Sequence, residues 1–149
     1  MKSEISSGGI VFCQKDQEWQ VLLVKHAATK YWGFPKGVVA DHQKDESLKE
    51  AALREVQEEG GVKAKIITAL PSPTRYQTSW RGEPIDKTVH YFVMQYLSGN
   101  PNNHDQEVSQ AGFFTIEQAS QTLTYENDRQ NLKKGLVLLL GIEPRTTKL

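Results

Sequence analysis

The sequence predicts an α/β (α+β) domain in which helices cover a mixed β-sheet. Two observations support this fold class. Strand-like segments both precede and follow one strongly patterned helix, an order that is typical of mixed sheets covered by helices. The length of 149 residues suits one compact domain. We therefore expect a single domain over residues 1–143, followed by a tail at residues 144–149.

The N-terminal segment predicts a β-hairpin followed by a loop. Residues 5–12 are β-branched and contain glycine, and residues 19–25 alternate between apolar and polar side chains. The turn between these two strands is expected at residues 16–18. Residues 31–37, Tyr-Trp-Gly-Phe-Pro-Lys-Gly, are interrupted by two glycines and a proline, which favours a loop.

The clearest helix is expected over residues 45–60. Asp45 is a suitable N-cap, and Gly60-Gly61 supplies the stop signal. The rest of the chain follows simpler patterns. We expect strands at residues 63–70, 87–97 and 111–115, loops at 71–86 and 98–106, a short helix capped by Thr115, and a last helix at 126–140.

Three glutamates on the expected helix carry the functional signal. With residues placed at about 100° intervals, Glu55 and Glu59 fall in the middle of the apolar arc, and Glu58 borders it. A carboxylate on a core-facing stripe is costly to desolvate unless it is paired or binds metal. Like charges one turn apart also repel each other. A divalent cation such as Mg²⁺ or Mn²⁺ resolves both problems, since hard oxygen ligands suit these ions.

A simpler interpretation of the same glutamates is a solvated acidic face. Acidic runs on helices usually face water, and Arg54 is placed to pair with Glu50 or Glu58. The helical projection alone leaves these two interpretations balanced.

The segment Arg54-Glu55-Val56-Gln57-Glu58-Glu59-Gly60-Gly61-Val62 resembles the second half of the Nudix box, G-x5-E-x7-R-E-U-x-E-E-x-G-U. It matches at every fixed position, and Glu46 stands seven residues before Arg54, as the motif requires. The glycine departs from the pattern, because Gly37 lies nine positions before Glu46 and Ala40 lies six before it. Either the loop after Gly37 carries three extra residues, or Gln43 occupies the place of the first glutamate.

This resemblance implies a Nudix-type α/β/α sandwich with a mixed β-sheet and a Mg²⁺-dependent hydrolysis of a nucleoside polyphosphate. Glu55, Glu58 and Glu59 would bind the metal together with the carbonyl of Gly37. Arg54 would orient the glutamates by pairing with Glu46 or its neighbours. Water would attack a phosphorus atom, and no covalent intermediate is expected.

The general base differs among members of this family. The candidates here are Glu55, Glu58 and Glu107, which lies in a later loop where relatives often supply a fourth metal-site glutamate. A solvated loop charge is the alternative interpretation of Glu107.

Further similarities point to the subgroup that cleaves diadenosine tetraphosphate to ATP and AMP. They are Trp32-Gly-Phe-Pro-Lys-Gly37, Lys87-Thr88-Val89-x-Tyr91 and Glu107-x-x-Gln110-Ala111. Basic side chains would contact the phosphate chain, and a tyrosine would stack on a purine. The candidates for substrate binding are Lys36, Lys87, Tyr91, Tyr125 and Arg75, with Arg81 as a further option; each tyrosine could equally be a half-buried ring.

Other functions stay open. Within the same enzyme class, the alternatives are a house-cleaning nucleoside triphosphate pyrophosphohydrolase, acting on canonical or oxidised nucleotides, and an RNA 5′-end pyrophosphohydrolase. A nucleotide-binding module without hydrolytic activity is a third option, although such domains usually lose the glutamates.

The composition limits the classes of partner that we expect for this protein. Eighteen basic and eighteen acidic side chains give zero formal charge, which argues against broad capture of nucleic acid or membrane. The single cysteine, Cys13, excludes an internal disulfide and fits a cytoplasmic protein. We expect a small nucleotide as partner and a monomer or homodimer.

Overall fold

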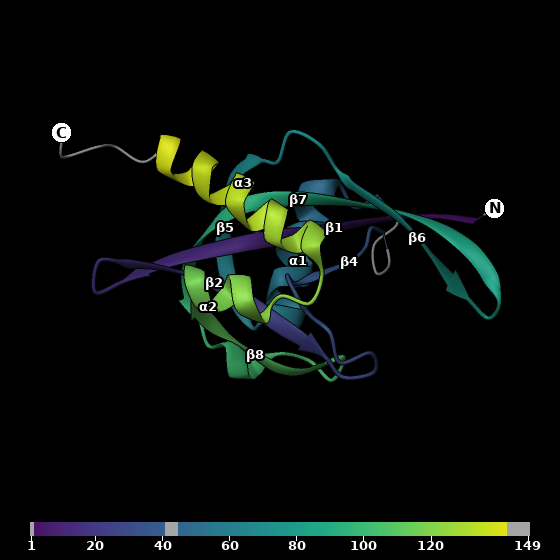
Figure 1. Ribbon diagram of the computed structural model, residues 1–149, viewed down its shortest axis with the longest axis horizontal. Helices are drawn as coiled ribbons and strands as arrows, with labels where there is room; N and C mark the ends of the chain where they lie inside the picture. The colour runs from purple at the N-terminus through teal and green to yellow at the C-terminus, as the bar shows by residue number, and fades with distance from the viewer. Residues whose placement is uncertain (1, 41–44, 143–149) are drawn as a thin grey trace.

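The computed structural model describes residues 2–40 and 45–142, in which an eight-stranded mixed sheet is covered by helices on both faces (Figure 1). The strand order is β3-β2-β1-β7-β5, with β4 paired to β1, β6 to β7 and β8 to β2. β1 and β7 run parallel, and the other pairs are antiparallel. The predicted α/β (α+β) class with a mixed sheet is therefore confirmed.

The strands and helices have the following bounds. The strands are β1 (Lys2–Lys15), β2 (Glu18–His26), β3 (Trp32–Gly33), β4 (Lys36–Val38), β5 (Val62–Ala69), β6 (Thr74–Trp80), β7 (Glu83–Gly99) and β8 (Val108–Thr115). The helices are α1 (Leu48–Gly60), a 3₁₀ turn (Pro101–Asn103), α2 (Ile116–Thr122) and α3 (Glu126–Ile142).

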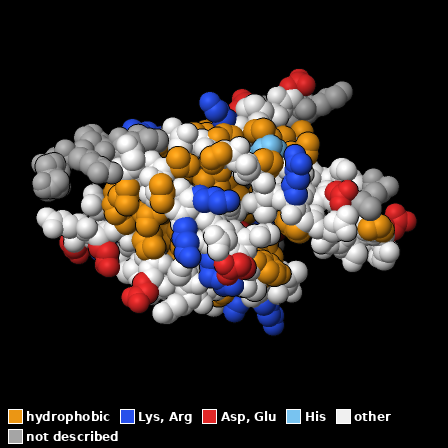
Figure 2. All heavy atoms as spheres, turned by 45° about the horizontal axis from the view of Figure 1, so that its top comes forward, with side chains coloured by type: hydrophobic (Ala, Val, Ile, Leu, Met, Phe, Trp, Pro, Cys, Tyr) orange, Lys and Arg blue, Asp and Glu red, His pale blue; other side chains and the backbone are white. Residues whose placement is uncertain are grey.

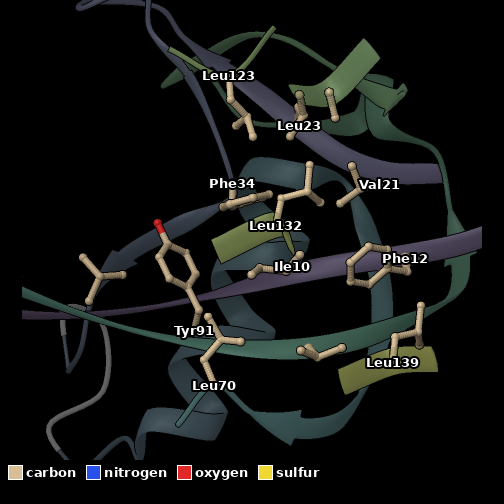
Figure 3. Packing of buried hydrophobic residues seen from close by; sticks show 13 residues of the cluster. Ile10, Phe12, Val21, Leu23, Phe34, Leu70, Tyr91, Leu123, Leu132 and Leu139 are labelled. Carbon is tan, nitrogen blue, oxygen red and sulfur yellow. The ribbon is translucent and has the colours of Figure 1, made fainter. Parts of the chain in front are cut away.

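Two hydrophobic clusters lie on opposite faces of the sheet. α1 contributes Ala52 and Val56 to the first cluster, which also contains Val11, Leu22, Phe92 and Met94. α2 and α3 cover the second cluster, shown in Figure 3 with Ile10, Phe12, Leu23, Phe34, Tyr91, Leu132 and Leu139. The alternation of side chains along β1 therefore supplies both cores, because successive residues point to opposite faces.

The expected loop at residues 71–86 is wrong. The chain forms β6 and the start of β7 instead, and this hairpin projects from one end of the molecule (Figure 1). Its tip is Arg81-Gly82, with φ values of 52° and 79°, as a two-residue hairpin turn requires. β6 is almost wholly exposed, so its sequence lacks the apolar alternation of a core strand.

The N-cap of α1 is Ser47 and not Asp45. The Ser47 hydroxyl accepts a hydrogen bond from the Glu50 amide at 3.1 Å, and the Glu50 carboxylate accepts one from the Ser47 amide at 2.9 Å. This reciprocal capping box satisfies two amide donors at the start of the helix. At the other end Gly61, with φ of 73°, terminates the helix as expected.

The expected loop at residues 31–37 also contains strand pairing, because β3 pairs with β2 and β4 pairs with β1. The remaining helices and strands match the expected ones, and most of them extend beyond the expected bounds. The expected loop at residues 98–106 holds the end of β7 and the 3₁₀ turn. The predicted tail at residues 144–149 lies outside the described residues, as does Gln43.

The surface mixes hydrophobic and basic side chains. On the face shown in Figure 2, hydrophobic side chains gather in patches with Lys and Arg between them. Val137 and Leu140 of α3 and Trp80 of β6 are among the exposed large hydrophobic residues. Within the described part of the chain, no helix combines the length and apolar character that crossing a membrane requires.

We expect the substitution Ser47→Ala to lower the free energy of unfolding by about 1 kcal/mol, because it removes the capping box of α1. Urea denaturation of the two proteins measures the difference. Ser79→Ala, at an exposed position of β6, is the matched control and should change stability by less than about 0.5 kcal/mol. Equal stabilities for the two variants would contradict the role of Ser47.

Candidate active site

The core-facing side of α1 carries the two glutamates that the helical projection placed there. Glu55 is 5% exposed and Glu59 is 4% exposed, whereas the Glu58 side chain is 37% exposed. The predicted geometry of these three residues is therefore confirmed. Two buried carboxylates one turn apart would be strongly unfavourable without partners, so their surroundings decide what they do.

Arg54 is the main partner of the acidic cluster. Its Nε and Nη2 donate to the two oxygens of Glu46 at 2.6 and 3.0 Å. Its Nη1 donates to Glu55 at 2.9 Å and to Glu58 at 3.1 Å. One guanidinium group thus connects three carboxylates, and the expected pairing of Arg54 with Glu46 is confirmed.

The position of Glu46 favours the first of the two registers considered for the motif. Its carboxylate forms a bidentate pair with Arg54 and also accepts a hydrogen bond from the Ala40 amide at 2.9 Å. Gly37 supports the same register, because a Cβ atom at this position would overlap the Glu55 carboxylate. These contacts agree with Gly37 as the motif glycine, Glu46 as the first glutamate and a longer loop between them.

The two buried glutamates have raised pKa values. Burial raises the pKa of Glu59 to about 8, against the hydrogen bond that it accepts from the Lys36 amide at 3.1 Å. Burial also raises the pKa of Glu55 to about 7, although the charge of Arg54 lowers it. The neighbouring carboxylates add to both shifts. The site therefore favours any species that brings positive charge to these oxygens.

The donor set fits a hard divalent cation. Carboxylate oxygens and a backbone carbonyl are the ligands that Mg²⁺ and Mn²⁺ prefer. Among the described residues, no three acidic, histidine or cysteine side chains already converge on one point. Glu55 and Glu58 are instead directed at Nη1 of Arg54. Each of these two bonds uses one oxygen of the carboxylate, so an ion bound here would share Glu55 and Glu58 with Arg54.

Lys36 lies beside the acidic cluster, and its side chain faces an aromatic cluster formed by His26, Tyr31 and Tyr125. Its Nζ lies 5.7 Å from the ring centre of Tyr31. Tyr31 stacks on His26, with ring centres 4.4 Å apart, and lies 5.3 Å from the ring of Tyr125. Lys36 is thus positioned to contact a ligand that extends from the glutamates toward these rings.

His26 is neutral in this setting. Burial, together with the charges of Lys36 and Lys87, lowers its pKa to about 4. Its Nε2 is buried without a hydrogen-bond partner among the described residues, 3.9 Å from Glu59.

Glu107 lies close to the acidic cluster but is exposed. Its charge contributes to the raised pKa of Glu55, and its backbone carbonyl accepts a hydrogen bond from the Ala27 amide at 2.9 Å. The neighbouring Asp105 amide donates to the Glu58 carbonyl at 2.8 Å, which ties this loop to α1. The structure therefore brings the predicted loop glutamate to the edge of the site.

The predicted substrate-binding residues Lys87, Tyr125, Tyr91 and Arg75 differ in their surroundings. Lys87 pairs with Glu4 at 3.2 Å and lies opposite Tyr76 in the sheet, and the exposed ring of Tyr125 adjoins Tyr31. Tyr91 is buried, with its ring 5.6 Å from that of Phe34, so only its hydroxyl lies at the edge of the core cluster (Figure 3). Arg75 lies in β6 opposite Thr88 of β7, one position before Tyr76, and is exposed.

Sequence reasoning missed several residues in and around the aromatic cluster. His26 and Tyr31 lie at either end of a short turn, and only the closed turn stacks their rings. Asp128 is buried in the first turn of α3, where an acidic side chain is usually solvated. No local pattern distinguishes these residues from surface ones, because their burial depends on contacts between distant segments.

We expect Gly37→Ala to weaken Mn²⁺ binding by about tenfold or more, because the new methyl group displaces the Glu55 carboxylate. Electron paramagnetic resonance of free Mn²⁺ measures the affinity. Gly112→Ala in β8 is the matched control, because the nearest neighbour of a Cβ atom there would be Phe114 Cε1, at 4.0 Å. Unchanged affinity in Gly37→Ala would show that the site does not need this glycine.

We also expect a pH dependence of stability in the metal-free protein. Glu59 has a pKa of about 8 in the folded chain and an ordinary value of 4.5, so between these values the folded state binds more protons than the unfolded state. The free energy of unfolding therefore falls as pH rises through this interval. Urea denaturation at several pH values, with a chelator present, measures this fall. The free energy of unfolding should decrease less steeply with pH in Glu59→Gln than in the native sequence. Identical dependence on pH in the two proteins would refute the raised pKa of Glu59.

Comparisons with known proteins agree with this geometry. The chain is 29% identical over 133 residues to MutT4 of Mycobacterium tuberculosis, a mutator protein by name, covering 85% of this chain and 52% of that protein. It is 34% identical over 105 residues to an RNA pyrophosphohydrolase of Shewanella denitrificans, covering 64% of this chain and 58% of that protein. The chain thus matches little more than half the length of these two relatives.

The fold is shared with solved structures. The binary complex of the Ap4A hydrolase from C. elegans superimposes with a TM-score of 0.73 at 20% identity, covering 93% of this chain and 99% of that one. The NUDIX domain family matches residues 5–135, which include the glutamates of α1, Arg54, Lys36 and Gly37. Since this match spans most of the sequence, the chain belongs to the Nudix family.

Proposed function

We propose that this protein hydrolyses a phosphoanhydride bond of a nucleoside polyphosphate with the help of Mg²⁺. The observation that carries the proposal is the pair of buried glutamates, Glu55 and Glu59, one helical turn apart and next to Lys36. Members of the family generally use a divalent metal. The raised pKa values of both carboxyl groups fit a site that receives such an ion, because ligation displaces their protons.

The metal ligands in this proposal are Glu55, Glu58 and Glu59 with the carbonyl of Gly37, and Glu107 is a further candidate. When bound, the ion neutralises charge on the phosphoryl oxygens. Arg54 positions the glutamates through its bonds to Glu46, Glu55 and Glu58. Lys36 contributes a positive charge between the glutamates and the ring of Tyr31, where the phosphate chain would pass.

The reaction is a direct displacement by water. The water oxygen bonds to a phosphorus atom, the bond from that phosphorus to the bridging oxygen breaks, and the leaving phosphate carries the electron pair. The water proton passes to a carboxylate, for which Glu55, Glu58 and Glu107 are the candidates. Glu107 is exposed and its side chain lies outside the Arg54 network, which suits a base that must exchange protons with solvent.

Our first choice of substrate is diadenosine tetraphosphate, cleaved to ATP and AMP. Support comes from the basic and aromatic residues beyond the glutamates, since a long phosphate chain needs several donors. The residues that we assign to substrate binding are Lys36, Lys87, Tyr125, the Tyr91 hydroxyl and Arg75. The similarity in fold to the Ap4A hydrolase of C. elegans is compatible with this choice.

A second candidate is release of pyrophosphate from a nucleoside triphosphate or from an RNA 5′ end. The names of the curated relatives, a mutator protein and an RNA pyrophosphohydrolase, support it. Zero net charge favours the small nucleotide over RNA, because RNA binding depends on basic surfaces.

Hydrolysis of a nucleotide panel in oxygen-18 water tests these proposals. Diadenosine tetraphosphate, canonical and oxidised triphosphates and a 5′-triphosphorylated RNA are compared with Mg²⁺ and with chelator. ATP together with AMP supports the first choice, and the labelled product identifies the phosphorus that water attacks. Pyrophosphate release supports the second. Absence of Mg²⁺-dependent hydrolysis across the panel would overturn the proposed function.

We expect Glu59→Gln to lower the turnover rate at least ~100-fold with the fold intact, because it removes a metal ligand and the transition-state stabilisation that depends on it. Steady-state kinetics on the best substrate and circular dichroism measure the two effects. Glu117→Gln, at an exposed position of α2, is the control and should retain full turnover. Near-normal Mg²⁺-dependent turnover in Glu59→Gln would refute the mechanism.

A further inference from the structure

His26 carries a buried ring nitrogen whose surroundings the proposed reaction does not explain. Among the described residues, the one buried side-chain nitrogen or oxygen without a hydrogen-bond partner is Nε2 of His26. Buried polar atoms in folded proteins are rarely left in this state. Glu59 Oε1 lies 3.9 Å from this nitrogen, whereas an N–H···O hydrogen bond is about 3 Å long. The two groups are therefore neighbours that are not yet bonded.

The turn between β2 and β3 holds the His26 ring in place. The ring stacks on Tyr31, with 4.4 Å between centres and 13° between planes. The His26 amide donates to the Tyr31 carbonyl at 3.0 Å, which closes the turn. The register between β2 and β8 also shifts between Lys25 and His26. Irregularities of this kind re-aim side chains and are common beside active sites, so the direction of Nε2 toward Glu59 is a built feature of the fold.

The two oxygens of Glu59 have different neighbours. Oε1 accepts a hydrogen bond from the Lys36 backbone amide at 3.1 Å, and it is also the oxygen beside His26 Nε2. Oε2 receives no hydrogen bond from the described residues. Two nitrogen atoms thus address one oxygen and leave the other to an ion. Carboxylates that bind metal are commonly held by hydrogen bonds from neighbouring groups, and this arrangement fits that pattern.

We propose that His26 positions Glu59 for ion binding by donating a hydrogen bond from Nε2 to Oε1. In a neutral imidazole one nitrogen donates and the other accepts, and an ionised carboxylate only accepts. The bond therefore requires the tautomer that carries its proton on Nε2. The atoms must approach by about 1 Å from their separation of 3.9 Å. The inference rests on the proposed function, because it takes Glu59 as a ligand of the ion, and His26 acts through Glu59 as a positioning residue.

The alternative role of His26 is packing alone. Its ring would then serve the stack with Tyr31, and a water molecule would satisfy Nε2. The two roles place different demands on the side chain. Positioning needs a donor at the place of Nε2, whereas packing needs a flat ring and no particular nitrogen.

Two amide variants separate these roles. The side-chain nitrogen of glutamine can reach the place of Nε2, whereas that of asparagine reaches only the place of Nδ1, and both variants lose the ring. Electron paramagnetic resonance of free Mn²⁺ measures the affinity for the ion. We expect the affinity to fall about tenfold or more in His26→Asn and to stay within about threefold of the native value in His26→Gln. His90→Gln, at a half-buried histidine of β7, is the matched control and should leave the affinity unchanged.

Nitrogen-15 NMR of the His26 ring in the native protein gives a second readout that does not depend on turnover. The chemical shifts of the two ring nitrogens distinguish the tautomers, and a hydrogen-bonded ring proton exchanges slowly with water. With Mg²⁺ present, we expect the proton on Nε2 and slow exchange. The spectrum of His26→Gln, which lacks this ring, assigns the signals. Thermal denaturation reports folding in every variant, and the measurement on the native protein stands even where a variant does not fold.

Three results would overturn the inference and leave the proposed hydrolysis untouched. Native Mn²⁺ affinity in His26→Asn would show that Glu59 needs no donor from this position. Equal losses in His26→Asn and His26→Gln would show that the ring matters and the nitrogen does not. A proton on Nδ1 in the presence of Mg²⁺ would leave Nε2 unable to donate. Absence of Mn²⁺ binding by the native protein is a different outcome, because it would reject the proposed function together with this inference.

Discussion

The Arg54 guanidinium is the contact on which the acidic site depends. It bonds to Glu46, Glu55, Glu58 and the carbonyl of Val38, and so ties the start of α1 to its middle and to the end of β4. Without it, the buried carboxylates of Glu46 and Glu55 would lose their charged partner. Removal of one partner from a buried ion pair is strongly destabilising. The same bonds hold the glutamates in a cluster that a cation could enter.

This dependence explains which parts of the site could be predicted from the sequence. Local spacing determines which residues share a helical face, so the placement of Glu55, Glu58 and Glu59 follows from their positions in the chain alone. The fixed positions of the motif then identified Arg54, whereas Gly37 stands outside the usual spacing and only its contact with Glu55 supports its place in the motif. The helix start was misplaced by two residues because Asp45 and Ser47 are both good caps, and only the reciprocal bonds with Glu50 distinguish Ser47.

The parts that were missed depend on distant contacts. The β6–β7 hairpin projects from the core, so its residues lack the apolar alternation that reveals a buried strand. Asp128 carries no local sign of burial, because its neighbours come from β3 and from the loop that leads into α3. Such sites appear only when the distances between segments are known.

The short strand β4 shows how the two halves of the site are kept in register. Successive residues of a strand point to opposite faces, so Gly37 faces Glu55 on the α1 side while the Lys36 side chain faces Tyr31 on the α3 side. Gly8 of β1 lies opposite Lys36, and a Cβ atom there would overlap the Lys36 side chain. A slip of one residue would exchange these faces, placing a side chain against Glu55 and moving the lysine away from Tyr31. The hydrogen bond from the Lys36 backbone amide to Glu59 opposes that slip. The residue that would contact the phosphates therefore also fixes the position of its own strand, β4.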